Sequence, residues 1–162
     1  RIDFNVNANT REGCCWLPRF GYEFTVAETN SKFTYFGKGP GENYCDLNDY
    51  ATYGMWSSDA KSEYFAYIMP QEHGNHIGVR YLELENGLKF VSDTPFECNV
   101  SQYTSEALFE AKHINELESD GTTHIRIDYK NSGLGSHSCG PELMEIYRVS
   151  GKDVDFNFSI KL

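Results

Sequence analysis

Apolar and polar residues alternate with a period of two along most of this chain. The alternation is clearest from Val154 to Ile160, where every second residue is apolar and the residues between are polar. Successive side chains of a strand point to opposite faces, so such a segment has one face for a core and one for water. The pattern therefore predicts half-buried antiparallel strands. The same alternation occurs at residues 20–26, 77–82, 96–100 and 125–129.

Turn-forming residues separate these segments at short intervals. Asn86-Gly87 is a typical hairpin turn, and Asp120-Gly121 and Ser150-Gly151 are further turn signals. Many short strands joined by such turns predict an all-β sandwich or barrel. One short helix is expected, capped by Thr104 and running to Ala111. Further strands are expected near residues 32–36, 62–69, 87–92 and 142–149.

The length and composition fit a single globular domain over residues 1–162, with no internal linker or repeat. Aromatic residues make up 15% of the chain, and Tyr and Phe supply most of them, which favours β-structure. The formal net charge of −10 opposes binding to nucleic acid, because a phosphate backbone is also negative. No apolar run is long enough to cross a membrane. Neither a nucleic acid nor a membrane is therefore an expected partner.

The spacing of cysteines and histidines does not fit a metal site. The cysteines lack the regular spacing of a zinc site or a disulfide framework, so free thiols are expected. His73 and His76 are three residues apart, but the sequence offers no third ligand beside them. We therefore expect no metal and no other cofactor in this chain. The cysteines are Cys14, Cys15, Cys45, Cys98 and Cys139.

The glycine-rich stretch GKGPGENYCD, at residues 37–46, suggests a phosphate-binding loop. Its spacing matches neither a P-loop nor a dinucleotide-binding fingerprint, and Pro40 removes a backbone donor. The residues alone therefore predict a tight corner between strands, followed by a polar loop from Glu42 to Asp46.

Several polar residues are candidates for chemistry, but none forms a specific catalytic pattern. Glu72 with His73 or His113 could act in acid–base catalysis, although polar loop residues are more often simply solvated. The stretch GLGSHSCGPEL, at residues 133–143, lacks the spacing of a nucleophile elbow, and a Cys–His pair there remains an alternative. No carboxylate pair stands out for glycoside hydrolysis, so no catalytic residue is assigned. The nucleophile and base candidates of that stretch are Ser136, His137, Ser138 and Cys139.

Five longer motifs follow one another along the chain. They are LPRFG (17–21), FGKGPGENYCD (36–46), YIMPQEHGNHIGVRYLEL (67–84), SQYTSEALFEAKHINEL (101–117) and GLGSHSCGPEL (133–143). Together they strongly resemble the C-terminal domain of the large beta-galactosidases of glycoside hydrolase family 2, which is the small-chain domain in split versions of those enzymes. The resemblance runs from about Leu17 to Leu162.

The resemblance implies an antiparallel β-supersandwich similar to galactose mutarotases, of which this chain would be the later, incomplete part. Missing strands would leave an exposed sheet edge or require a partner chain, and an oligomer would fit. In such enzymes the acid/base and nucleophile glutamates lie in a separate TIM-barrel domain, against which the C-terminal domain packs. The chain alone is therefore expected to be inactive. Its expected partners are that barrel, the other domains of the enzyme and galactosides such as lactose.

The resemblance also assigns roles to individual residues. The loop at 133–143 would lie at the rim of the substrate pocket, with His137, Ser138, Cys139 and Gly140 as the rim candidates. Some members of the family that the chain resembles have a Trp where this chain has Cys139, and a cysteine offers no aromatic ring to stack on a sugar. The residues that shape the corner are Gly39, Pro40, Glu42, Asn43 and Tyr44.

Two other functions stay open on the sequence. The aromatic content and the implied mutarotase-like fold also fit a stand-alone carbohydrate-binding module, in which Trp16, Trp56 or Tyr44 could stack on a sugar. A mutarotase-type enzyme would instead use His73 or His113 with a carboxylate. The resemblance favours the non-catalytic galactosidase domain over both.

Overall fold

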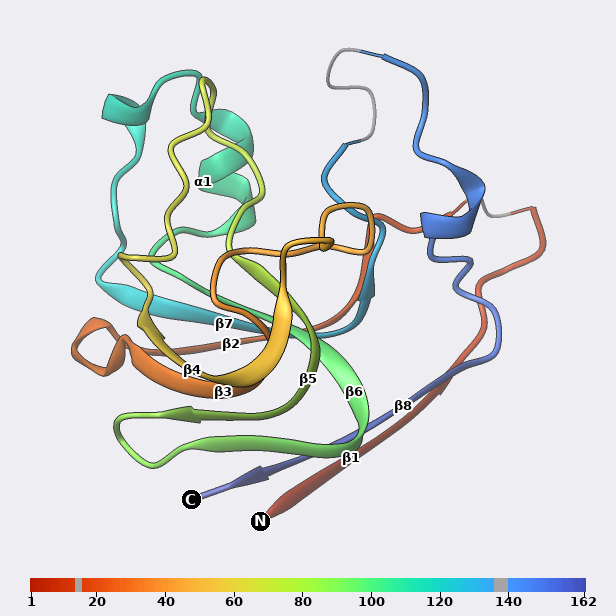
Figure 1. Ribbon diagram of the computed structural model, residues 1–162, viewed down its shortest axis with the longest axis horizontal. Coiled ribbons are helices and arrows are strands. Elements are labelled where there is room, and N and C mark those ends of the chain that lie inside the picture. The colour runs from red at the N-terminus through yellow and green to blue at the C-terminus, as the bar shows by residue number, and fades with distance from the viewer. Residues whose placement is uncertain (14–15, 136–139) are drawn as a thin grey trace.

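The computed structural model describes residues 1–13, 16–135 and 140–162. Within these ranges the chain is almost entirely antiparallel β-structure, which confirms the predicted all-β fold (Figure 1). The short helices are α1 (Ser105–Glu110), η1 (Glu28–Asn30), η2 (Ile114–Glu116) and η3 (Glu145–Tyr147). The strands are β1 (Ile2–Ala8), β2 (Arg19–Ala27), β3 (Lys32–Gly39), β4 (Thr52–Asp59), β5 (Asn75–Leu84), β6 (Lys89–Ser101), β7 (Thr122–Asn131) and β8 (Val154–Lys161).

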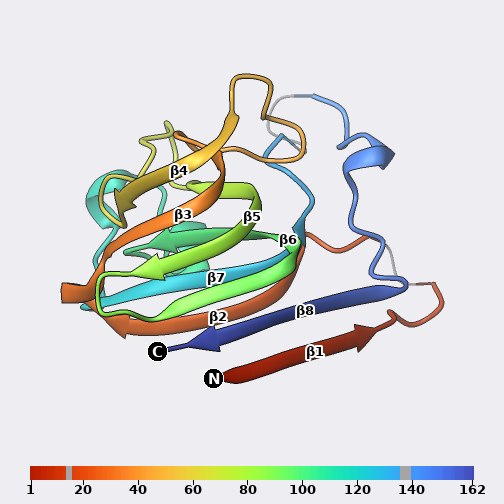
Figure 2. The same cartoon turned by 60° about the horizontal axis from the view of Figure 1, so that its bottom comes forward.

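These strands belong to one sheet, and β6 joins its parts. β5 pairs along one edge of β6, and β3 and β4 follow beyond it. The other edge of β6 is shared, because its residues 89–91 pair with β8 and its residues 97–101 pair with β7. β1 then pairs with β8, and β2 pairs with β7. The sheet therefore divides on that side into a β7–β2 arm and a β8–β1 arm (Figure 2).

The sheet divides at the middle of β6, where the sequence places Pro95. Proline has no N–H group and cannot donate to a sheet ladder. The pairing with β8 stops at Val91 and the pairing with β7 begins at Glu97, so Pro95 lies where neither arm needs a donor. The strand can therefore serve two arms without leaving a ladder hydrogen bond unmade.

The two arms pack against each other through aromatic side chains. Phe24 of β2 lies edge to face with Phe4 of β1 at 6.0 Å and with Phe158 of β8 at 6.3 Å between ring centroids. Phe4 also meets Tyr22 of β2 edge to face at 5.3 Å. These contacts close a sandwich-like core. Its buried members are Phe33, Tyr35, Ala60, Val79, Leu82, Leu84, Phe90, Phe96, Cys98, Val100, Ile125, Ile127, Val154, Phe156 and Phe158.

Most of the predicted elements are confirmed. The alternating segments lie in β2, β5, β6, β7 and β8, and the strands expected near 32–36 and 87–92 lie in β3 and at the start of β6. The helix is confirmed as α1, and the Thr104 hydroxyl accepts a hydrogen bond from the Ala107 amide at 3.0 Å. No helix among the described residues is long and apolar enough to span a membrane.

Two predicted strands are wrong. Residues 62–69 form a loop, whose Tyr64 ring packs edge-on against loop residues rather than into the sheet. Residues 142–149 contain η3 instead of a strand, and among the described residues their β-pairing is the isolated bridge between Leu17 and Val149. The apolar residues of these segments therefore pack between loops and do not belong to strands of the sheet.

Two strands, β1 and β4, are absent from the sequence-based prediction. In β4, Tyr53 and Met55 are exposed apolar residues, and Gly54 between them has no side chain for the core. The apolar residues of β4 therefore lie on its exposed face. The sequence does not show the pattern of a half-buried strand, in which the apolar residues face the core. β1 lies in the first ten residues, whose pattern alone indicated no definite element.

Replacing Phe158 by alanine tests the packing between the arms. Phe158 is buried and contacts the rings of Phe4, Phe24 and Phe156. We expect Phe158→Ala to lower the free energy of unfolding by about 3–5 kcal/mol, measured by urea denaturation, because the change leaves a cavity in the core. Phe109→Ala is the matched control, since Phe109 is 90% exposed, and it should change stability by less than about 0.5 kcal/mol. Equal losses in the two variants would contradict this packing.

Candidate functional site

The glycine-rich corner follows β3. A Cβ on Gly39 would lie 2.3 Å from the Tyr35 hydroxyl and 2.6 Å from the indole of Trp56, so no larger side chain fits there. The Gly39–Pro40 peptide bond is cis. Glycine at position 39 therefore serves close packing, and no phosphate site is needed to explain it.

Asn43 is buried and ties this corner to β5. Its side-chain amide donates to the carbonyl oxygens of Lys38 and Gly41, each at 2.9 Å. Its side-chain oxygen accepts from the Ile77 amide at 2.8 Å. One side chain thus satisfies backbone groups from two separate segments, as burial of polar groups requires.

Glu42 and Tyr44 bind the next loop along the chain. The Glu42 carboxylate accepts hydrogen bonds from the Gly74 amide at 2.7 Å and from the Tyr67 hydroxyl. Tyr44 is fully buried, and its hydroxyl donates to Glu72 at 3.4 Å. The polar residues after the corner therefore hold the loop before β5 in place.

His76 is buried between two polar partners. Its Nδ1 lies 2.9 Å from the Tyr35 hydroxyl, and its Nε2 lies 2.9 Å from the Glu63 carboxylate. Both ring nitrogens therefore have partners within the fold. His76 is a core histidine with satisfied hydrogen bonds.

His73 and His113 lie in different environments. His73 is buried, with Nδ1 2.9 Å from the Gln71 carbonyl oxygen, whereas His113 is exposed and contacts Glu116 at 2.9 Å. Over residues 1–13, 16–135 and 140–162, no group of three or more His, Cys, Asp or Glu side chains is placed to hold a metal ion. The contacts of these histidines give no support to a mutarotase-type site.

Asp46 joins the corner to the loop that begins at Gly133. Its carboxylate accepts hydrogen bonds from the amide of Leu134 at 3.0 and 3.1 Å and from the amide of Gly135 at 2.9 Å. A Cβ on Gly133, where φ is +86°, would lie 2.4 Å from the Asp46 carboxylate. The approach of this carboxylate and the left-handed backbone both require glycine at position 133.

Two buried carboxyl groups lie below this loop. Burial raises the pKa of Glu97 to about 8, although Asn75 donates to its carboxylate at 3.0 Å. Burial also raises the pKa of Asp128 to about 6, against the attraction of Arg19, whose Nε lies 3.4 Å away. Arg19 in turn binds Glu72 at 2.9 Å. A polar network thus continues from the sheet to the base of the loops.

The cysteines in the described part of the chain are free thiols, as expected. Cys45 is half-buried and Cys98 is fully buried. Burial raises the pKa of the Cys45 thiol to about 12, so it has little thiolate character at neutral pH. Cys14, Cys15 and Cys139 lie outside the described residues.

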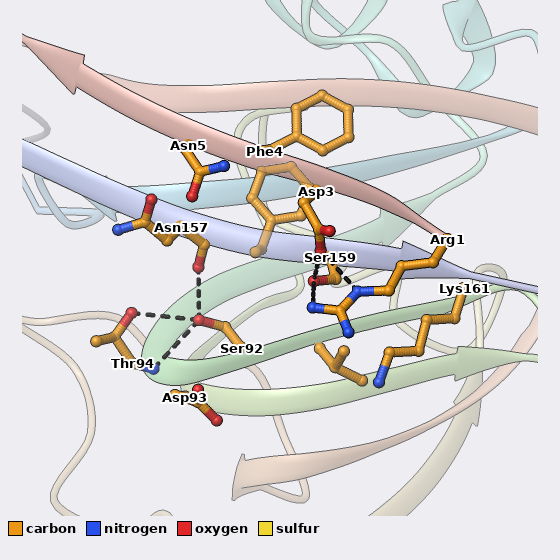
Figure 3. A pocket seen from close by; sticks show the side chains of 12 residues that line it. Arg1, Asp3, Phe4, Asn5, Ser92, Asp93, Thr94, Asn157, Ser159 and Lys161 are labelled. Atoms are coloured by element: carbon orange, nitrogen blue, oxygen red, sulfur yellow. Dashed lines mark hydrogen bonds and ion pairs between the residues drawn. The ribbon is translucent and has the colours of Figure 1, made fainter.

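A cavity of about 770 Å³ lies where β1, β8 and the bend of β6 meet. Its polar walls are bonded to one another: the Ser92 hydroxyl donates to the Asn157 carbonyl at 2.6 Å, and Arg1 binds Asp3 at 2.8 Å (Figure 3). This groove lies apart from every motif that the sequence analysis singled out.

Two smaller cavities lie against the loop at residues 133–143. One, of about 310 Å³, has Trp16, Arg19, Glu72 and Leu134 among its walls. The other, of about 270 Å³, lies between Asp46, Gly135, Gly140 and Tyr147. We take these two cavities and the described residues of this loop, 133–135 and 140–143, as the candidate functional site.

The structure describes only part of the predicted rim. Gly140 is exposed and lines the cavity of about 270 Å³. His137, Ser138 and Cys139 lie outside the described residues. Sequence reasoning did not single out Asp46 or Arg19, because their partners are 88 and 53 residues away in the chain.

Residues 1–162 match the family model described as beta galactosidase small chain. The chain belongs to the beta-galactosidase small-chain family. It is 40% identical over 161 residues to a beta-galactosidase of Actinobacillus pleuropneumoniae, covering 99% of this chain and 16% of that protein. It is 36% identical over 155 residues to a beta-galactosidase of Staphylococcus xylosus, covering 90% of this chain and 15% of that protein. The family resemblance is confirmed, and the chain spans about 15% of the length of these relatives.

Glu97→Gln tests the buried carboxyl of this small-chain domain. The pKa of Glu97 is higher in the folded chain than its ordinary value of 4.5, so the folded state binds the proton more tightly. The free energy of unfolding should therefore fall as pH rises from about 5 to about 8, and Glu97→Gln should remove part of that slope. Urea denaturation across this range measures it. Glu118→Gln, at an exposed position, should keep the slope, and the same slope in all three proteins would refute the assignment.

Asp46→Asn tests the link between the corner and the loop. Asparagine keeps the shape but offers one acceptor oxygen and no charge, so at least one bond to the Leu134 or Gly135 amide is lost. We expect the free energy of unfolding to fall by about 1–2 kcal/mol, measured by urea denaturation. Asp49→Asn, which changes an exposed carboxylate three residues away, should have almost no effect. An equal loss of stability in Asp46→Asn and Asp49→Asn would show that the Asp46 carboxylate does not hold the loop in place.

Proposed function

We propose that this chain is the non-catalytic C-terminal domain of a beta-galactosidase, which packs against the catalytic TIM barrel and shapes the rim of the galactoside pocket. The observation that carries the proposal is the match of the whole chain to the small-chain family, together with its small share of each relative. The hydrolysis itself belongs to the parent polypeptide. The substrate class is then a galactoside such as lactose.

The exposed side chains support packing against another domain. Ile68 is fully exposed, and Phe109 and Ile146 are mostly exposed, although each is large and apolar. Monomeric proteins rarely gather such residues on one surface unless a partner covers it. The loop at residues 62–69 and α1, which carry Ile68 and Phe109, lie side by side at the end of the molecule opposite the chain termini, whereas η3 lies on the other side (Figure 1). We call the surface of this loop, α1 and η2 the loop face, and its exposed apolar residues are Phe65, Ile68, Met69, Phe109 and Ile114.

The two carboxyl groups with strongly raised pKa values, Glu97 and Asp128, do not fit the role of catalytic carboxyls. A glycosidase needs two carboxyl groups on either side of the glycosidic bond, within reach of the sugar. Glu97 and Asp128 have raised pKa values, but both are buried in the network beneath the loops. Neither can touch a substrate in this fold. Their altered titration therefore reflects burial and not catalysis.

Exchange of domains tests the proposed function. The matching segment of the Actinobacillus pleuropneumoniae beta-galactosidase would be replaced by this chain, which is 40% identical to it. We expect the chimera to hydrolyse a nitrophenyl galactoside, the same enzyme without the segment to lose activity, and the chain alone to be inactive. Hydrolysis by the chain alone, or full activity without the segment, would overturn the proposal.

A pair of variants in the chimera locates the contact with the barrel. Ile68→Asp introduces a charge on the loop face, whereas Leu162→Asp introduces one at a position that is equally exposed but lies at the other end of the fold. Only Ile68→Asp should lower the activity and the thermal stability of the chimera, because burial of an unpaired charge is costly. The reverse result would place the barrel on the opposite surface.

A further inference from the structure

The cavity of about 310 Å³ has the size and the walls of a small-ligand site. Ligand pockets commonly begin near 300 Å³ and combine apolar walls with a few placed polar groups. Here the apolar walls include Trp16, Pro18 and Leu134, and the polar ones include Arg19 and Glu72. Every one of these residues lies in the described part of the chain.

The structure selects one aromatic residue from the three that the sequence left open. Tyr44 is fully buried and cannot meet a ligand. Trp56 packs on the glycines of the corner, and its indole N–H donates to the Gly37 carbonyl at 3.3 Å. Trp16 lines the cavity, and the Arg148 guanidinium lies over its ring at 5.7 Å from the centroid. The cation–π contact with Arg148 favours this position of the indole, and Trp16 is the one of the three that lines the cavity.

The polar wall is the Arg19–Glu72 ion pair, in which Arg19 also lies 3.4 Å from Asp128 and Glu72 lies 3.8 Å from Arg126. Arg19 donates to Glu72 at 2.9 Å through Nη2, and both side chains are about one-quarter exposed. A guanidinium has five N–H donors and a carboxylate has several acceptor positions, so the pair has further capacity. A sugar hydroxyl both donates and accepts, and it can bridge such a pair. An anionic ligand is disfavoured, because Glu72 and the net charge of −10 repel it.

We propose that this cavity binds one neutral saccharide ring, with Trp16 as the stacking wall and the Arg19–Glu72 pair as the hydrogen-bonding wall. The inference deepens the proposed function, since a galactosidase domain would bring a galactoside unit to this cavity. It does not depend on the barrel, because all the binding groups lie in this chain. Carbohydrate rings commonly bind through an aromatic face and a few charged hydrogen-bonding groups.

Tryptophan fluorescence gives a direct test, because the chain has two tryptophans. In Trp56→Phe, Trp16 is the only remaining indole. Titration of this variant with lactose should change the fluorescence saturably, with a dissociation constant on the order of 1–10 mM. Titration with mannitol, a polyol without a ring, should give no saturable change. A linear response to both compounds would overturn the proposal.

Variants of the walls separate recognition from folding. Trp16→Ala and Arg19→Lys in the otherwise unchanged chain should each weaken lactose binding at least tenfold, as followed by protein NMR shifts. Asn5→Ala, in the groove of about 770 Å³, should leave the affinity unchanged. Trp16→Phe keeps an aromatic ring in the wall of the cavity. It should bind lactose more tightly than Trp16→Ala, and this comparison serves as the test if Trp16→Ala also disturbs folding. NMR shifts that map to Asn5 and Asn157 rather than to Arg19 and Leu134 would contradict the site.

The outcome is independent of the domain exchange. A chimera that hydrolyses galactosides while the chain alone binds no sugar would reject the saccharide site and leave the proposed function standing. Binding at Trp16 with an inactive chimera would reject the galactosidase role and favour a stand-alone carbohydrate-binding module.

Discussion

The whole architecture depends on β6, whose backbone serves β5 on one edge and two different strands on the other. A strand can carry a residue without an N–H group at the point where its pairing changes, and Pro95 lies at that point of β6. The two arms that result enclose the aromatic core, and their far ends carry the loops of the candidate site.

Above the core, the fold is held by polar contacts between distant loops. Asn43 bonds to β5, Asp46 to the loop at Gly133, and Arg19 to both Glu72 and Asp128. Such buried polar groups stabilise a fold only when their partners are in place, and each one therefore fixes the position of another segment. The position of the site therefore depends on the core, because the pairing of the strands determines which loops lie next to one another.

The sequence predicts the regular part of this fold well, because alternation of polarity follows directly from the geometry of a strand. The sequence does not predict β4, because the apolar residues Tyr53 and Met55 lie on its exposed face. The resemblance draws attention to the corner and to the loop at 133–143, but the Asp46 link between them joins residues 88 apart. The sequence places Glu97 on the polar side of a strand, but its side chain is buried where β6 pairs with β7, opposite Asp128. Local pattern therefore gives the elements, whereas their long-range pairing determines the site.

The pairing of β1 with β8 has a consequence for the order of folding. The β5–β6 hairpin closes through the turn at Asn86-Gly87, so it can form from neighbouring residues. In contrast, β1 and β8 lie at opposite ends of the sequence, as the pairing of Ile2 with Ile160 shows. Contacts of such high sequence separation form slowly, because loop closure precedes any gain from pairing. We therefore expect this arm to assemble late, because β1 pairs with β8 and has no partner strand until β8 has been synthesised.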